Sequence, residues 1–530
     1  MIAKFSGNLL WRQSPTAVFS ALTERRHNRS SDQSDDERPG DRWLKYIFTG
    51  SCVISVTALI ACFTAASVFA QNAATSSKIT VNAAERFQTI DGFGVNFNGT
   101  YFRDAQAPMI DMLIDDLGAT IFRLDPYGLL SWEAVNDNDD SNVMNWEYYN
   151  DRYSIPTFEA SWAAARYLNS RGLRPLLALS GIAPDWMLDS NAPPPQHKVC
   201  GGSSGMGHAG PMKPNHLSPT MYDEFAEEVV SLAVYARNRA RIDFQYFGPI
   251  NETDCYPAEG PRVDPDEMPK LLSAVARGMK KEGLGDVRLV VAEQAIVTTD
   301  YIDPIIQEPD LMKQVGVFAF HTYGSDSVGL QVERVRASKY PDTPVWLTEY
   351  GDLKDMDKSA ENEWAGFSVA ATQRALRALN QGARAALYWD AYDNYHEHYP
   401  RLTFYGLIQN VDHVYSPKKR YYAAKQLYRF VRPGSQRISA AVDSPGLTVS
   451  AFRNDRADEF VIVAVKKAGI DHVQVVLSTA APLPAQWELY QTTRKLDCAK
   501  TNTVPIRNGV ADVDLPDEAI FTLVGKVGKS

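Results

Sequence analysis

The sequence has no surplus of positive charge. It carries 64 acidic against 54 basic side chains, which gives a formal net charge of -10. Nucleic-acid binding depends largely on Lys and Arg side chains that neutralise phosphates, so this balance argues against a nucleic-acid partner. The five cysteines include no CxxC pair and no other metal-ligand spacing. The sequence therefore indicates no metal site and no cofactor.

The remaining composition is that of an ordinary globular protein. At 530 residues with 45% hydrophobic and 22% charged residues, the chain can bury a large core and is long enough for more than one domain. The 10 Trp and 25 Tyr residues are numerous. Aromatic rings with polar edges suit protein cores and the faces of sugars.

The N-terminal region is set apart from the fold. Residues 1–45 are polar and charged, which predicts a disordered segment, and residues 46–70 form an uncharged apolar run behind basic residues. This pattern predicts a signal peptide cleaved before Gln71, so that the rest is exported, either secreted or periplasmic. An uncleaved membrane anchor is the alternative, and a lipoprotein cleavage box at Cys62 is a third interpretation. Membrane association is expected only if the segment stays uncleaved or is lipidated.

Three cysteines remain in the part predicted to be exported, namely Cys200, Cys255 and Cys498. Export permits disulfides, and we expect Cys200 to pair with Cys255 because both fall in loops on one face of the predicted fold. An unpaired buried thiol is the alternative.

From residue 91 to 432 the sequence alternates short β-branched or apolar runs with longer amphipathic stretches. This alternation is typical of repeated strand–helix units around a parallel sheet. Eight units predict an α/β fold, a (β/α)8 TIM barrel. No glycine-rich GxGxxG loop follows an early strand, which argues against a doubly wound open sheet. The predicted strands are 92–96, 119–124, 174–180, 244–250, 287–293, 315–321, 344–349 and 385–390.

Residues 433–527 alternate apolar and polar side chains between turns, with no helical stretch. They predict a small antiparallel β-sandwich. Residues 78–90 have the same two-residue period and no partner of their own. We therefore expect them to cross over and join the C-terminal sandwich, so that both chain ends build this side domain.

Two glutamates follow predicted strands directly. Glu252 ends "GPINE" on the fourth strand and Glu349 ends "WLTE" on the seventh. A loop glutamate is usually a solvated surface residue. In a TIM barrel, however, the carboxyl ends of all strands meet on one face, so these two side chains are expected to point into one bowl. Two neighbouring acids can then take different protonation states.

Other strand ends carry polar residues that fit the same bowl. Tyr323 and His321, at the sixth strand, can hold a carboxylate, although His321 alone reads better as a hydrogen-bonded core histidine than as a catalyst. Arg123 ends the second strand, and a buried guanidinium needs an acidic partner. Glu349 is the expected partner, while Glu293 is either a third acid in the bowl or a further partner of Arg123.

These motifs resemble the retaining glycoside hydrolases of clan A, and most closely glycoside hydrolase family 30. The Asn-Glu pair of the fourth strand and the glutamate of the seventh are similar to that clan's acid/base and nucleophile. The segments "FQTIDGFG" and "YYAAKQLYRFVRPGSQRI" resemble the barrel entry and the last helix with its domain junction in family 30. The resemblance spans roughly residues 79–527 and implies a side β-sandwich built from both chain ends.

The resemblance implies an exported hydrolase that cleaves a β-linked oligo- or polysaccharide by double displacement. Glu349 is expected to be the nucleophile and Glu252 the acid/base, with carboxyl groups about 5 to 5.5 Å apart. It also implies that Asn251 binds a sugar 2-hydroxyl and that Trp389 is the sugar platform, with a barrel-plug aromatic as the alternative. Trp186 is an expected subsite wall.

Departures from the family pattern leave the sugar open. Thr253 follows the Asn-Glu pair where family 30 often has proline, and the third-strand loop keeps only Pro184, Trp186 and Met187. The resemblance allows xylan, β-1,6-glucan, β-1,6-galactan or a glucosyl lipid.

Two other functions remain as alternatives. A catalytically inactive carbohydrate-binding barrel protein would keep the same residues. A metal-dependent barrel hydrolase needs several strand-end histidines, and His321 alone qualifies. The loop sequence "DNDDSN" is similar to a calcium loop but lacks the glycine and the terminal glutamate of an EF-hand.

Overall fold

The computed structural model describes residues 75–528, apart from 127–130, 198, 200–214, 256–258, 325–326, 397–398, 481 and 516. The predicted disordered region and the predicted signal peptide or anchor, residues 1–70, lie outside the described residues, and so does Cys200. Cys255 is disulfide-bonded, whereas Cys498 is a free, buried thiol. Among the described residues, none of the helices combines the length and the apolar character that crossing a membrane requires.

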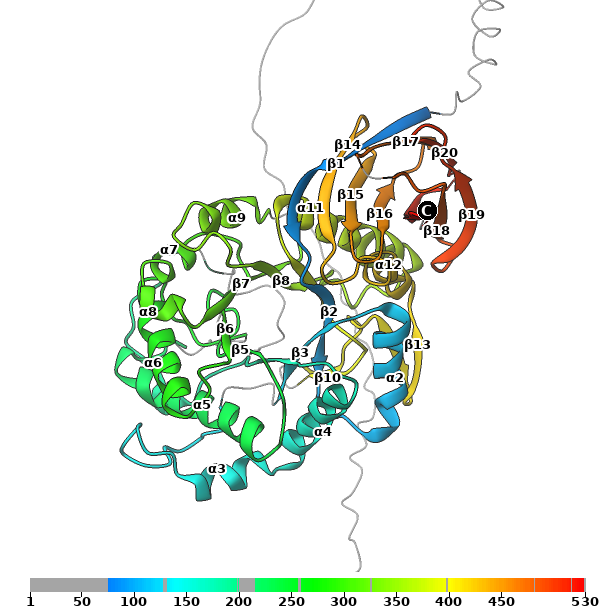
Figure 1. Cartoon of the computed structure of the whole chain (residues 1–530). Helices are drawn as coiled ribbons and strands as arrows, with labels where there is room; N and C mark the ends of the chain where they lie inside the picture. Colours follow the sequence, from blue (N-terminus) through cyan, green and yellow to red (C-terminus); the bar gives the residue numbers. More distant parts are fainter. Residues whose placement is uncertain are drawn as a thin grey trace, which may run out of the picture. The chain divides into compact units, whose positions relative to one another are not determined.

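Eight parallel strands form a closed barrel in chain order, which confirms the predicted TIM barrel (Figure 1). Each predicted strand overlaps an observed one. The barrel interior is filled by apolar side chains such as Val290, Val317 and Trp346, so it is a packed core and not a pore. The barrel strands are β2 (Gly92–Asn98), β3 (Ile121–Asp125), β4 (Leu176–Ala178), β5 (Tyr246–Gly248), β6 (Arg288–Gln294), β7 (Val315–Thr322), β8 (Val345–Tyr350) and β9 (Ala385–Tyr388).

Helices lie outside the ring of strands and bury one face against it (Figure 1). In α11 the apolar residues Ala375, Leu376 and Leu379 recur at helical spacing, and Gly382 ends the helix in the left-handed conformation that glycine tolerates. The α-helices are α2 (Ala107–Asp111), α3 (Trp146–Tyr153), α4 (Pro156–Ser170), α5 (Tyr222–Asn238), α6 (Met268–Lys281), α7 (Ile302–Ile305), α8 (Pro309–Met312), α9 (Gly329–Arg336), α10 (Ala360–Asn362), α11 (Ala371–Gln381) and α12 (Lys419–Tyr428).

Shorter elements connect these helices and strands. Two π-helical segments, η2 (Met112–Leu117) and η5 (Glu363–Ala370), continue α2 and α10, and three short turns are 3-10 helices, namely η1 (Asp104–Gln106), η3 (Asp185–Met187) and η4 (Pro219–Met221). After β9 the chain forms two hairpins. Their strands are β10 (Tyr395–His396) with β11 (Tyr399–Leu402), and β12 (Ile408–Val411) with β13 (Val414–Pro417).

The chain ends build a nine-stranded sheet beside the barrel, which confirms the predicted side domain. β1 (Thr75–Thr89) pairs antiparallel with β14 and parallel with β17, so the N-terminal strand does cross over. The sheet encloses its own apolar core, and its edge strands β19 and β20 contact each other. The other strands are β14 (Gln436–Val442), β15 (Leu447–Asn454), β16 (Glu459–Lys466), β17 (Ile470–Ser478), β18 (Gln486–Thr492), β19 (Ala499–Pro505), β20 (Val510–Asp514) and β21 (Ala519–Lys526).

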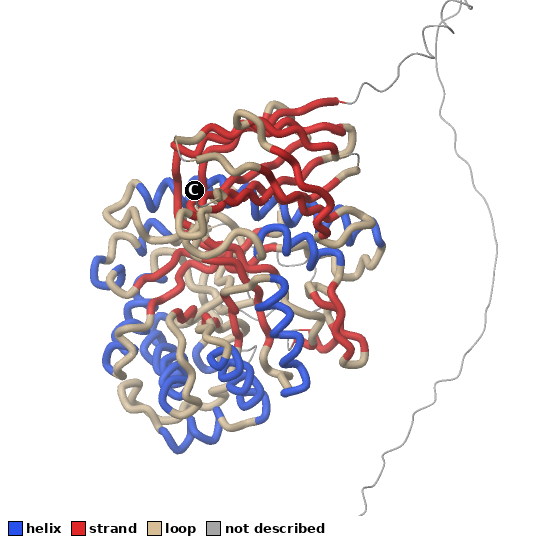
Figure 2. The backbone as a smooth tube through the Cα atoms, turned by 45° about the vertical axis from the view of Figure 1, so that its right-hand side comes forward, coloured by secondary structure: helices blue, strands red, loops and turns tan. Residues whose placement is uncertain are grey.

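Helix α12 joins the side sheet to the barrel. Its last residue, Tyr428, donates a hydrogen bond to the carbonyl of Gly94 in β2 at 2.9 Å. From the same helix, Gln426 donates to Thr492 Oγ1 at 2.9 Å and accepts from Thr522 Oγ1 at 2.7 Å, both in the sheet. α11 and α12 contact sheet strands β15, β18 and β21, and Figure 2 shows these helices beside the strands.

Candidate active site

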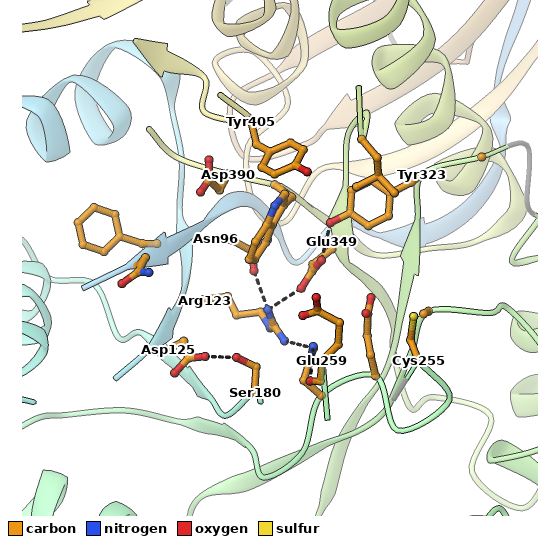
Figure 3. A pocket seen from close by; sticks show the side chains of 18 residues that line it. Asn96, Arg123, Asp125, Ser180, Cys255, Glu259, Tyr323, Glu349, Asp390 and Tyr405 are labelled. Carbon is orange, nitrogen blue, oxygen red and sulfur yellow. Dashed lines mark hydrogen bonds and ion pairs between the residues drawn. The ribbon is translucent and has the colours of Figure 1, made fainter. Parts of the chain in front are cut away.

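Polar side chains from several barrel strands meet at the carboxyl ends of those strands. Glu252 lies four residues beyond β5, Glu349 is the fifth residue of β8, and His321 is the seventh residue of β7. Arg123 is the third residue of β3. Figure 3 shows Arg123 beside Glu349 in the centre of the resulting cavity.

Arg123 holds four partners at once. Its Nη1 donates to Asn96 Oδ1 at 2.8 Å and to Glu349 Oε1 at 2.9 Å. Its Nη2 donates to Asn251 Oδ1 at 2.6 Å and to Glu293 Oε2 at 3.0 Å. The side chain is 5% exposed, so this guanidinium is a buried charge compensated by acids from two other strands.

His321 links the carboxylates from the other side. Its Nδ1 lies 2.5 Å from Glu252 Oε1 and 3.4 Å from Glu349 Oε2, and its Nε2 lies 2.9 Å from Glu293 Oε2. Burial opposes the charge on this ring, but the adjacent Glu349 and Glu252 raise the pKa of His321 to about 10. The ring is therefore an imidazolium at neutral pH that donates from both nitrogens, which leaves no lone pair for a metal ion.

Glu349 is held by two further donors besides His321. Arg123 binds Oε1, and the Tyr323 hydroxyl donates to Oε2 at 2.5 Å. Burial raises the pKa of Glu349, while His321 and Arg123 oppose that rise. Hydrogen bonds to a carboxylate favour its charged form, so these donors oppose the effect of burial.

Glu252 and Glu349 are close neighbours. One carboxylate oxygen from each and one ring nitrogen of His321 all lie within 4.8 Å of one another. An inverting pair of carboxyl groups needs about 6.5 to 9.5 Å to admit a water molecule between them, whereas a retaining pair is about 5 to 5.5 Å apart. The observed separation agrees with the retaining arrangement.

Two cations face the carboxylates of the site. Burial opposes ionisation of Glu293, but Arg123 and then His321 lower the pKa of that carboxyl, so Glu293 is ionised. Arg123 is bonded to Glu293 and Glu349, and His321 is bonded to Glu252 and Glu293. The chain therefore supplies its own counter-charges to these acids.

The backbone that carries these acids is strained. Glu252 and Glu293 have φ values of 36° and 42°, and Ala292 has φ of 73°, all in the region that L-residues seldom occupy. The Glu252 N–H donates to the Glu293 carbonyl at 2.9 Å and so fixes the two strand ends against each other. Such strain costs about 1 to 3 kcal/mol per residue and is concentrated at functional sites.

The cavity around these residues has a volume of about 240 Å³. About eight molecules of liquid water occupy that volume, which is on the order of the volume of one sugar ring. Trp389, half-buried after β9, lines it. Trp186 does not line it, and its indole N–H instead donates to the Glu133 carbonyl at 2.8 Å. Further lining residues that sequence reasoning missed are Asn96, Asp125, Ser180, Glu259, Asp390 and Tyr405.

Glu259 is the nearest of these additional acids to the chemistry. Its carbonyl accepts from Asn251 Nδ2 and from the Gly181 N–H, both at 3.2 Å, which ties the loop after β5 to the site. A Cβ atom on Gly260 would lie 1.8 Å from the Asn251 carbonyl, so this return of the chain requires glycine. Burial, followed by Glu252 and Glu349, raises the pKa of Glu259 well above its ordinary value.

Comparison with known proteins was made on sequence and on structure. No protein-family model matches the chain. Over 446 residues the chain is 22% identical to a glucuronoxylanase, XynC, of Bacillus subtilis. The alignment covers 82% of this chain and 90% of that protein.

Solved structures show the same fold. A family 30 endoxylanase of Clostridium papyrosolvens superposes with a TM-score of 0.64 and 21% identity, covering 85% of this chain and all of the other. A family 30 subfamily 8 xylanase of Clostridium acetobutylicum has a TM-score of 0.61 with 18% identity over 85% of this chain and all of the other. An endo-β-1,6-glucanase has a TM-score of 0.57 with 16% identity, covering 85% of this chain and 94% of the other. These comparisons confirm the resemblance to glycoside hydrolase family 30.

Proposed function

We propose that this protein is a retaining β-glycoside hydrolase that acts on a β-linked, xylan-like glycan. Glu349 attacks the anomeric carbon while Glu252 gives its proton to the leaving oxygen. Water then attacks the glycosyl-enzyme, with Glu252 acting as the base. Two inversions leave the anomeric configuration unchanged.

The observation that carries this proposal is the separation of the two glutamates, whose carboxylate oxygens lie within 4.8 Å of each other beside one imidazolium. Arg123 and Tyr323 bind Glu349 and so favour its ionised form, which a nucleophile needs. Glu252, the other carboxyl of the pair, is then the residue that donates the proton.

Two other residues suit the sugar. Asn251 uses its Oδ1 for Arg123 and one Nδ2 hydrogen for the Glu259 carbonyl, so its second Nδ2 hydrogen is available for a sugar hydroxyl. Trp389 lines the cavity and offers a flat apolar face with a polar edge to the ring.

The lining of the cavity favours a neutral sugar at the cleavage site. Beside the two catalytic glutamates it contains Asp125, Glu259 and Asp390, and its one cation among the described residues is Arg123, which is bonded to protein acceptors. A uronate bound here would find no free cation among the described lining residues. We therefore expect cleavage between uncharged units, even though relatives named glucuronoxylanases share the fold.

The test pairs two variants with a screen of neutral xylan, glucuronoxylan and β-1,6-glucan. Glu349→Ala is expected to remove turnover, by at least about 10³-fold in kcat. Azide should restore activity and give the inverted glycosyl azide. Glu252→Ala should spare aryl glycosides with good leaving groups far more than polysaccharide, because protonation matters least there.

Glu308→Ala, at an exposed glutamate between α7 and α8, is the matched control and should keep full activity. Unchanged turnover in Glu349→Ala, or an inverted product from the parent enzyme, would end the assignment. Tight binding of glycan without turnover on any substrate would indicate the carbohydrate-binding alternative.

A further inference from the structure

A second group of acids lies beside the barrel on its helical flank. Helix α5 supplies Glu224, Glu227 and Glu228, and the segment after β3 supplies Glu133 and Asp137. We call these five residues the flank cluster. α3 packs against α5 in the same region, so the segment 131–145 is held close to this helix.

Glu227 is the residue that needs explanation. It is 4% exposed, and both of its carboxylate oxygens are buried without a hydrogen-bond partner among the described residues. Asp137 and then Glu133, both in the segment after β3, are the charged groups that act on it most strongly. Burying a carboxylate without any partner costs several kcal/mol.

Its neighbours are only partly satisfied. Glu228 is fully buried, accepts the Glu133 N–H at 3.3 Å with Oε1, and has no partner for Oε2. Glu133, 1% exposed, accepts the Tyr149 hydroxyl at 2.9 Å and the Asp137 N–H at 3.2 Å. The cluster therefore has more buried oxygens than donors.

The described part of the chain offers this cluster no cation. None of its five members forms an ion pair with a described Lys, Arg or His. Two basic side chains near this segment have other partners: Lys281 donates to the Asn142 carbonyl at 2.6 Å, and Arg152 donates to the Tyr148 hydroxyl at 3.3 Å. Burial raises the pKa of Glu227 to about 9 and that of Glu133 to about 7.

We propose that the flank cluster binds a hard divalent cation of the size of calcium, with Glu227 as the central ligand and Glu133 and Asp137 as the carboxylates opposite it. Calcium accepts six to eight oxygens at about 2.3 to 2.6 Å in flexible geometry, so main-chain carbonyls and water can complete the shell. The cluster offers oxygen alone, without histidine or thiolate, which disfavours zinc and copper.

The cation has a structural role, because the site joins a loop to a helix. It ties the segment 131–145 to α5, and the indole of Trp186 is bonded to that segment through the Glu133 carbonyl. It is distinct from the proposed catalytic centre, which needs no metal.

One other group of potential ligands, His216, Asp264 and Glu267, has atoms within 4.8 Å of one another. It carries no proposal, because Arg262 already binds both oxygens of Asp264 at 2.7 Å. The flank cluster does not show three acid oxygens so close together. The proposal therefore requires these side chains to move toward the ion on binding.

The test uses the whole chain, treated with EDTA and then titrated with calcium chloride at pH 7.5. We expect a Kd at or below about 1 mM and a rise of several degrees in Tm. Magnesium is expected to have a smaller effect because it demands a rigid octahedral shell.

Glu227→Gln keeps the shape of the side chain and should abolish the calcium-dependent rise in Tm. Asp223→Asn, an exposed residue of the same helix that faces Arg277, is the matched control and should keep the rise. If Glu227→Gln does not fold, Glu133→Gln replaces it and should weaken calcium binding at least tenfold. No calcium effect on the parent protein, an equal effect in Glu227→Gln, or a larger effect of magnesium would each overturn the proposal.

Discussion

Two groups of buried carboxylates lie in this barrel protein, and they differ in what neutralises them. Around Glu252 and Glu349 the chain supplies its own cations, Arg123 and His321, each bonded to two acids. Around Glu227 the described residues supply none. Burial of a carboxylate requires a cation, a proton or several hydrogen bonds, so the two groups must meet this requirement in different ways.

The backbone explains part of the difference. Arg123, His321 and Glu349 stand within barrel strands, where main-chain hydrogen bonds to neighbouring strands fix every position. The flank cluster joins a helix to an irregular segment. Fixed charges suit proton transfer and nucleophilic attack, because both need constant geometry. A cluster that can close around an ion does not need that constancy.

Removing the Arg123 guanidinium should have the largest effect on stability and on activity. Arg123→Met keeps the apolar stem but leaves Glu293 and Glu349 buried without their partner. We expect the free energy of unfolding to fall by about 3 to 5 kcal/mol, as for other broken buried ion pairs, and glycosidase turnover to be lost. Urea unfolding followed by fluorescence, together with an aryl glycoside assay, measures both.

Arg288→Met, at the exposed first residue of β6, is the control for that variant and should change stability by less than about 0.5 kcal/mol. If Arg123→Met were as stable as the parent, the acids of the site would be neutral without help. The contrast with the flank cluster would then disappear.

The sequence predicted the carboxylates around Glu252 and Glu349, which have cations beside them, better than it predicted the flank cluster. All eight barrel strands and both strand-end glutamates could be located because an apolar run followed directly by a carboxylate is a local signal. Glu227 and Glu228 stand in "EFAEEVV", which has the composition of an ordinary helix surface. Their burial depends on where the segment after β3 packs, and no local pattern encodes that packing.

Other misses have the same origin. β19 shows no apolar alternation in the sequence, because this edge strand is mostly exposed and polar. β14 begins within the segment "YYAAKQLYRFVRPGSQRI", so the sequence does not mark it as a separate strand. Asp125, Ser180 and Glu259 reach the cavity from loops and strand ends distant in sequence, and only the closed barrel brings them together.

The flank cluster can be tested through the pH dependence of protein stability in the absence of calcium. Burial raises the pKa of Glu227 to about 9, against 4.5 in the unfolded chain. Between these values the unfolded chain has lost the proton and the folded chain keeps it, so stability falls as pH rises. Below pH 4.5 both states are protonated and the effect vanishes.

Glu227→Gln removes this titration. We expect the metal-free variant to be more stable than the parent by about 1 to 3 kcal/mol at pH 8 and to match it at pH 4. Tm measured across that range with EDTA present reports the difference. A variant that is less stable than the parent at pH 8 would show that the Glu227 carboxylate is paired, and the two groups of acids would then be alike.

The smallest effect is expected at Glu259, which shares features of both groups. It lies in the catalytic cavity, but no described side chain is bonded to its carboxyl, and burial with Glu252 and Glu349 nearby raises its pKa well above the ordinary value. The neutral form of Glu259 is therefore favoured. Glu259→Gln replaces one neutral group with another of the same shape, so kcat/KM near pH 7 should change by less than about threefold.

Glu259→Lys should instead lower activity more than about tenfold, because a cation beside Glu252 favours loss of the proton that this residue must donate. A pH profile of kcat/KM for both variants decides the point, since a loss in Glu259→Gln as large as that in Glu252→Ala would make Glu259 the proton donor.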